Sequence, residues 1–252
     1  MDDPVEVLVA IPAHDEAATI GSCLTSVVAS LRAAQWLGSV GRARVAVAVH
    51  RCRDDTEALV REAGKVAAGP GPGVELLIMV EEQPMRVGRL RTRLVEAAYG
   101  GQPAADAWVL STDADTLVPL HWVDELLAIA RREDAALVLG LADLSGWDVA
   151  AEVAERYREI VDAGLTSTGH RHAYAANLAI RLDAFRRVGG FPALAHGEEH
   201  GLARAVRAAG LRISTPLQPR VLTSARMPGR AAHGLGALLD DLAHQPLRED
   251  LR

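Results

Sequence analysis

Apolar runs of strand length alternate with helical segments through the first half of the sequence. The strand-like runs cover residues 5–11, 44–49, 74–80 and 107–113. Between them, apolar residues at helical spacing mark residues 19–34, 54–68 and 87–100. Units of this kind form parallel sheets, because each helix carries the chain back to the edge where the previous strand began. We therefore predict an α/β fold with a mostly parallel, Rossmann-like sheet and helices on both faces.

The second half of the chain has a less regular pattern. Helical periodicity marks residues 121–132, 148–164, 199–210 and 235–243, and strand-like runs mark residues 136–142 and 176–181. We find no internal repeat, low-complexity tract or clear linker, so we expect a single domain over residues 1–252.

Charge and cysteine content exclude several classes of protein. A formal charge of −6 disfavours general binding to nucleic acid or to anionic membranes. The cysteines Cys23 and Cys52 are far apart, which argues against a disulfide framework and a thiolate zinc site. The acidic start does not resemble a signal peptide, and no apolar stretch approaches the roughly 20 residues that span a bilayer. We expect a cytoplasmic protein without a transmembrane segment.

Polar loops follow each of the four predicted strands, at residues 12–16, 50–55, 81–89 and 113–116. Ligands of doubly wound sheets bind beyond the carboxyl ends of the strands, so we expect these loops to converge on one site. In the last loop, Asp113 and Asp115 lie two residues apart in a D-x-D pattern. Two close carboxylates favour a divalent cation completed by substrate phosphates, although Asp115 could instead cap the following helix.

Five motifs in order resemble those of family 2 glycosyltransferases with the GT-A fold. They are "VLVAIPAHDEAATIGSCLTSV", "VAVAVHRCRDDT", "VGRLRTRLVEAA", "STDADTLVP", and "AANLAIRLDAFRRVGGFP" followed by "GEEHGLARAVRAAG". The resemblance implies an enzyme that moves a sugar from a nucleotide-diphosphate sugar, UDP- or GDP-linked, to a hydroxyl-bearing acceptor. It also implies a donor-binding half at residues 1–116 and an acceptor-binding half at residues 117–252.

The resemblance further implies roles for individual residues. Asp115 would ligate Mg²⁺ or Mn²⁺, with His233 as a further ligand from a mobile C-terminal segment. The residues expected to bind the nucleotide-sugar are Pro12, Ala13, Glu16, Asp54, Arg91, Asp113, Ala114 and Arg226. His50 stands where the family often has an acidic residue, and Asp15 replaces its usual Asn.

The stretch "HGEEHGL" allows several interpretations. The family's acidic pair places the catalytic base at Glu199, with Glu198 as the second choice, and transfer would then invert the anomeric carbon. The letters H-x-x-E-H instead spell a zinc-hydrolase motif built from His196, Glu199 and His200. Both glutamates could also merely favour the positive end of a helix dipole. A sugar-nucleotide-binding module without catalysis is the other alternative, and retention of the anomeric configuration also stays open.

Overall fold

A computed structural model describes residues 3–67, 69, 71–100, 106–226 and 235–244. The strands are β1 (Val5–Ala13), β2 (Val40–His50), β3 (Val74–Glu81), β4 (Ala107–Ser111), β5 (Thr116–Leu117), β6 (Leu137–Leu139), β7 (Leu141–Ser145), β8 (Leu178–Arg181), β9 (Ile213–Ser214) and β10 (Arg220–Ser224). The helices are α1 (Ile20–Trp36), α2 (Thr56–Ala67), α3 (Val87–Tyr99), α4 (Trp122–Glu133), α5 (Ala151–Ala163), α6 (Leu182–Arg187), α7 (Glu198–Ala208) and α8 (Leu235–His244).

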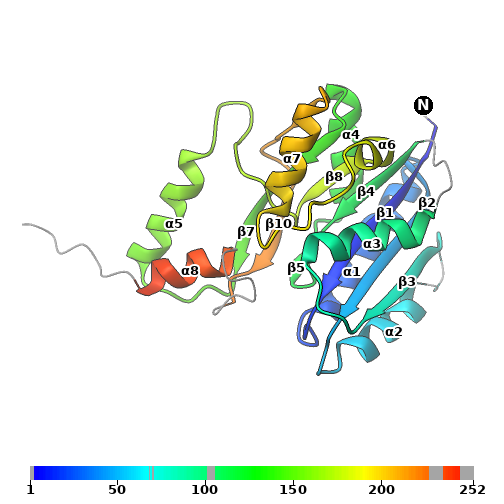
Figure 1. The fold of residues 1–252 in the computed structure, drawn as a ribbon, viewed down its shortest axis with the longest axis horizontal. Helices are drawn as coiled ribbons and strands as arrows, with labels where there is room; N and C mark the ends of the chain where they lie inside the picture. Colours follow the sequence, from blue (N-terminus) through cyan, green and yellow to red (C-terminus); the bar gives the residue numbers. More distant parts are fainter. Residues whose placement is uncertain (1–2, 68, 70, 101–105, 227–234, 245–252) are drawn as a thin grey trace, which may run out of the picture.

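A seven-stranded sheet in the order β3-β2-β1-β4-β8-β6-β9 forms the centre of the fold. Its strands run parallel to their neighbours except β8, which is antiparallel to both β4 and β6. The prediction of a mostly parallel sheet is therefore confirmed. A second sheet of three short strands, β5-β10-β7, lies beside it (Figure 1).

Strand β1 shows why the sheet needs helices on both faces. Val7, Val9 and Ile11 point into a core shared with α1 and α4, while Leu8 and Ala10 point into a core shared with α3, α6 and α7. All five side chains are fully buried. A strand covered on both sides reads as a continuous apolar run, which is how residues 5–11 look in the sequence.

Gly140 divides the strand predicted at residues 136–142, so that prediction is wrong in detail. Its two parts are β6 in the large sheet and β7 in the small one. A Cβ atom on Gly140 would lie 2.2 Å from the side-chain nitrogen of Asn177. That buried amide donates to the carbonyls of Leu141 and Pro219 and accepts from the indole N–H of Trp122. The glycine therefore lets one asparagine fix the junction between the sheets.

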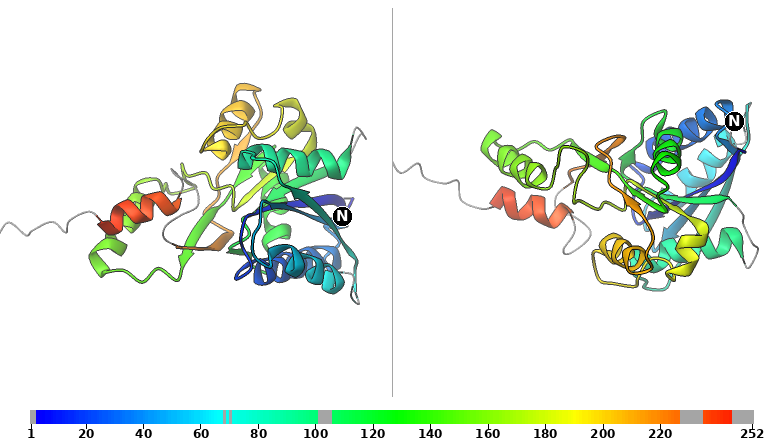
Figure 2. Two further views of the ribbon diagram at one scale, coloured as in Figure 1. Left: turned by 60° about the horizontal axis from the view of Figure 1, so that its bottom comes forward. Right: turned by 90° about the horizontal axis from the view of Figure 1, so that it is seen from above.

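Helices α5 and α8 lie outside this layered arrangement. They pack against each other beyond the small sheet, away from α1 and α2 (Figures 1 and 2). The Arg156 guanidinium donates to the carbonyl of Leu242 at 2.9 Å, which ties the two helices together. No helix in the described residues combines the length and hydropathy that a bilayer crossing requires.

Candidate active site

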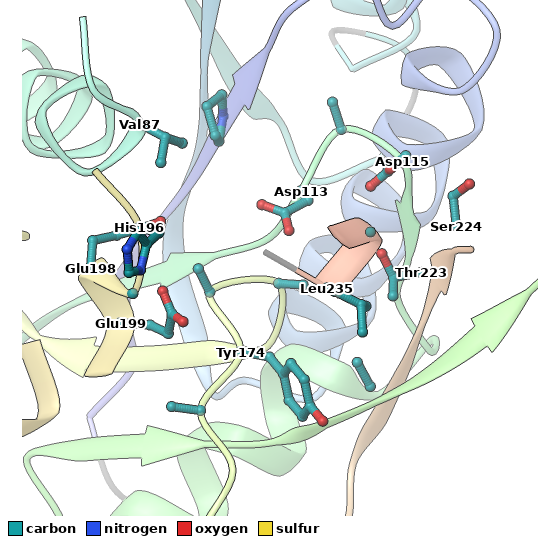
Figure 3. Close-up of a pocket in the computed structure, with 18 of the residues that line it drawn as sticks. Val87, Asp113, Asp115, Tyr174, His196, Glu198, Glu199, Thr223, Ser224 and Leu235 are labelled. Carbon is teal, nitrogen blue, oxygen red and sulfur yellow. The ribbon is translucent and has the colours of Figure 1, made fainter. Parts of the chain in front are cut away.

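A cavity of about 770 Å³ opens beyond the carboxyl ends of β1 and β4. The loops after these strands, the amino-terminal ends of α3 and α7, the end of β10, and helices α5 and α8 form its walls. Pockets of this size are typical of small-molecule sites. Figure 3 shows Asp113 and Asp115 on one side of the opening and Glu198 and Glu199 on another.

Three of the four polar loops contribute two or more residues to this cavity. Residues 12–16 contribute Pro12, Ala13 and Glu16, and residues 113–116 contribute the D-x-D motif with Ala114 between its carboxylates. Residues 81–89 reach the cavity through Met85 and Val87. The expected convergence therefore holds for these loops.

The loop at residues 50–55 contributes only His50 to the cavity wall. Asp54, which we expected in the nucleoside pocket, does not line the cavity. Its exposed carboxylate accepts hydrogen bonds from the backbone N–H groups of Ala17 and Thr56, at 2.9 and 3.0 Å. Asp54 therefore holds the loop after β1 against the start of α2.

Asp115 lies in a crowded acidic environment. Burial, together with the carboxylates of Asp113 and Glu16, raises the pKa of Asp115 to about 6. The Arg226 guanidinium approaches Asp115 at 3.4 Å and makes two shorter contacts with Glu16, at 2.9 and 3.0 Å. Arg226 therefore brings the end of β10 to the loop after β1, and its charge offsets part of the acidic surplus.

Arg91 links the D-x-D loop to helix α7. Its side chain is only 2% exposed, and its guanidinium pairs with Asp113 and, at 2.5 Å, with Glu198. Helices α3 and α7 approach closely here, because a Cβ atom on Gly88 would lie 3.0 Å from the Cβ atom of Glu198 and 2.6 Å from the Pro192 carbonyl oxygen. We expected Arg91 beside the nucleotide. Arg91 does line the cavity, and Asp113 and Glu198 hold its guanidinium there.

The two glutamates of α7 have different surroundings. Glu198 is buried and paired with Arg91, whereas no ion pair with an arginine or lysine holds Glu199 among the described residues. Burial, and then the neighbouring Glu198 carboxylate, raises the pKa of Glu199 to about 7. A carboxylate with such a pKa, directed into a cavity, has the properties of a general base.

The zinc-hydrolase motif does not form a metal site. Helix α7 begins at Glu198, and Gly197 before it has a left-handed backbone with φ of 70°. His196 therefore lies outside the helix, and the one-turn spacing that two zinc ligands need is lost. Within the described ranges, Asp15, Cys52 and Asp54 are the single set of three or more candidate ligands, and they lie apart from this motif. His233 falls outside the described residues.

The family model of glycosyl transferase family 2 matches residues 8–189. The chain belongs to this family. The match covers the first motif from Leu8, the next three motifs in full, and the fifth motif as far as Gly189, so it ends before the acidic pair of α7. Comparison with curated proteins finds no match.

Solved structures of glycosyltransferases share the fold of this family 2 chain. S. aureus TarS 1–349 in complex with UDP-GlcNAc superposes with a TM-score of 0.66 at 14% identity, covering 96% of this chain and 68% of that one. The mannosyltransferase PcManGT from Pyrobaculum calidifontis, in complex with GDP-Man and Mn²⁺, gives 0.64 at 17%, covering 90% and 59%. The fold is therefore GT-A, as the motifs predicted. This chain spans 68% of the TarS 1–349 chain and 59% of the PcManGT chain.

The cavity also has a wall that we did not predict. Helix α5 contributes Tyr157, Ile160 and Val161, and the segment before β8 contributes Tyr174. The spacing of three and then one residue on α5 is that of one helical face. The apolar face of α5 was therefore the signal in the sequence.

Proposed function

We propose that this glycosyltransferase moves a sugar from a nucleotide-diphosphate sugar to a hydroxyl acceptor, with inversion of the anomeric carbon. The supporting observation is that one cavity contains both the D-x-D carboxylates and Glu199. The first group suits a diphosphate with its cation, and the second suits an acceptor hydroxyl. We propose residues 1–116 as the main donor-binding part and residues 117–252 as the main acceptor-binding part.

Mg²⁺ or Mn²⁺ fits the residues on the donor side. Asp113 and Asp115 offer hard oxygen ligands, and such cations are commonly held by one or two carboxylates and substrate phosphates. Burial, and then the Asp113 and Glu16 carboxylates, raise the pKa of Asp115, and a cation would offset the negative charge of these neighbours. When bound, the ion would supply positive charge against the leaving diphosphate. The solved relatives bind UDP-GlcNAc, or GDP-Man with Mn²⁺, which supports a UDP- or GDP-linked donor.

Glu199 is the better candidate for the base. Glu198 is committed to Arg91, and moving its carboxylate would leave a buried guanidinium short of a partner. In the proposed step, the acceptor oxygen bonds to the anomeric carbon as the bond from that carbon to the diphosphate oxygen breaks. The bonding pair leaves with the diphosphate, and the hydroxyl proton passes to Glu199. One in-line displacement inverts the anomeric carbon.

Arg91 and Glu198 would act as positioning residues in this scheme. Arg91 holds Asp113 from one side and Glu198 from the other, so it fixes the D-x-D loop relative to the helix that carries Glu199. We further propose a cytoplasmic location, because both cysteines, Cys23 and Cys52, are free thiols, as is usual in reducing compartments.

Thermal unfolding with UDP, GDP, dTDP or CDP, each with Mn²⁺, Mg²⁺ or EDTA, tests the donor site. A ligand at 100 times its Kd adds about 2.7 kcal/mol, which raises the Tm of a chain of this size by roughly 5–10 °C. Asp115→Ala should abolish the metal-dependent rise. Asp148→Ala, at an exposed residue outside the cavity, should keep it. No response to any nucleotide, or a full response in Asp115→Ala, would refute the proposal.

Glu199→Gln separates an enzyme from a binding module. The amide keeps the size of the side chain but cannot accept the acceptor proton. We expect normal nucleotide-dependent stabilisation with release of the nucleoside diphosphate slowed at least about a hundredfold, the usual scale of general-base effects. Equal rates in both proteins would place the base elsewhere.

A further inference from the structure

The part of the cavity lined by α5, α8 and the segment before β8 differs in chemistry from the D-x-D motif. Its wall consists of Tyr157, Ile160, Val161, Tyr174, Leu235 and Leu238. These side chains come from α5, from the segment before β8 and from α8. The fold brings these three stretches of the chain to one side of the cavity. Figure 3 shows Tyr174 and Leu235 at the same opening as Glu199.

The polar groups on this wall are the phenols of Tyr157 and Tyr174, the His172 imidazole and the Arg171 guanidinium. The His172 ring nitrogen Nε2 lies 2.7 Å from the Val161 carbonyl oxygen, so that atom already has a partner. The Tyr174 ring stacks on His172, with centroids 5.8 Å apart. Burial raises the pKa of both tyrosines, Tyr157 and Tyr174, so both phenols are neutral near pH 7. The Arg171 side chain is exposed and also lines the cavity on that segment.

The aliphatic members of the wall are not covered by the described protein. Ile160 is 42% exposed although it faces the cavity, and Leu235 and Leu238 are half-buried. Apolar side chains around a cavity gain free energy when a ligand removes them from water. A sugar placed there would lose water from its hydroxyl groups without gaining hydrogen bonds from these side chains. An apolar ligand is therefore favoured on this side.

We propose that the acceptor carries its hydroxyl on an apolar body, which lies against α5, Tyr174 and α8 while the hydroxyl faces Glu199. This assignment rests on the proposed glycosyl transfer and names the class of acceptor: an alcohol or phenol with an apolar ring or chain, and not a second sugar. Glu199 and this wall line the same cavity. One acceptor molecule could therefore contact the wall with its apolar body and Glu199 with its hydroxyl.

Calorimetric titration of the protein with three probes tests the proposal. The probes are 2-naphthol for a ring, 1-octanol for a chain and methyl β-D-glucopyranoside for a sugar, each added with the nucleoside diphosphate and cation that stabilise the protein most. We expect at least one apolar probe to bind tenfold or more tightly than the glucoside. The stronger of the two apolar probes tells whether the body is a ring or a chain.

Two variants test whether the apolar probes bind at this wall. Ile160→Asp and Leu238→Asp put a charge against the apolar body and should weaken its binding about tenfold or more. Leu59→Asp is the matched control, because Leu59 is a 37% exposed leucine on α2 outside the cavity. The inference is overturned if neither apolar probe binds more tightly than the glucoside, or if all three variants bind equally well.

The nucleotide response distinguishes the two possible failures. If nucleoside diphosphates stabilise the protein but the apolar probes fail, only the acceptor class is wrong. If no nucleotide stabilises it, glycosyl transfer from a nucleotide-diphosphate sugar is itself refuted. In that case even variant-sensitive binding of naphthol would not identify an acceptor.

Discussion

Replacing Glu198 by alanine should cost this protein a large part of its stability. The Glu198 side chain is 7% exposed and pairs with an Arg91 guanidinium that is 2% exposed. Removing one partner of a buried ion pair costs about 3–5 kcal/mol, because the remaining charge is left buried. Arg91 keeps its contact with Asp113, which favours the lower end of that range. A loss of about 3 kcal/mol lowers the Tm of a chain of this size by roughly 6–12 °C.

Helix α3 provides the matched control. Arg89 and Glu96 also form an arginine–glutamate pair, at 2.9 Å, but both side chains are about half exposed. Glu96→Ala should therefore cost less than about 1 kcal/mol, since water screens the pair. Differential scanning calorimetry and urea unfolding of both variants measure the contrast. Equal losses in Glu198→Ala and Glu96→Ala would show that Arg91 does not depend on Glu198.

Three further predictions concern Glu199 and the packing of α3. Turnover should rise with pH and level off above about pH 7, because Glu199 must lose its proton to act as a base; a profile flat from pH 5 to 8 contradicts this role. The folded-state pKa of Glu199 lies above its ordinary 4.5, so its stabilising contribution is present below pH 4.5 and is lost as pH rises through about 7. Glu199→Gln should therefore be more stable than the natural protein at pH 8, by on the order of 3 kcal/mol, with little difference at pH 4.5; urea unfolding at both pH values tests the sign. Gly88→Ala should cost about 1–3 kcal/mol, because its Cβ would meet the Pro192 carbonyl. Gly21→Ala on α1, with nothing within 4 Å, should instead stabilise the protein by up to about 1 kcal/mol, and thermal unfolding of the pair measures the difference.

Local patterns in the sequence predicted most of the fold. The strands β1, β2 and β3 and the helices between them lie where apolar spacing placed them, since each element buries the residues that mark it. The pattern failed at residues 136–142, where a glycine within an apolar run lets the chain change sheets. It also gave no sign of α6, whose six residues are too short to show helical periodicity.

The sequence predicted which residues belong to the candidate site, but it did not predict the contacts that these residues make with one another. Short motifs identified Asp113, Asp115 and the two glutamates. The pairing of Arg91 with Glu198 spans 107 residues, and that of Arg226 with Glu16 spans 210. Contacts at such separations depend on how complete layers pack, and no local pattern encodes them. For Asp54 the motif suggested a ligand contact, whereas its carboxylate holds the loop after β1 against the start of α2. The sequence alone does not distinguish these two roles of an aspartate.

The position of α5 and α8 outside the two packed cores bears on how this protein can evolve. Most substitutions in a core lower stability, so a binding surface built on core elements changes slowly. Here most of the apolar wall of the cavity lies on a pair of helices that the central sheet does not need for its own burial. Substitutions can therefore accumulate in that wall without disturbing the packing around Asp113 and Asp115. Related chains should differ most in these two helices.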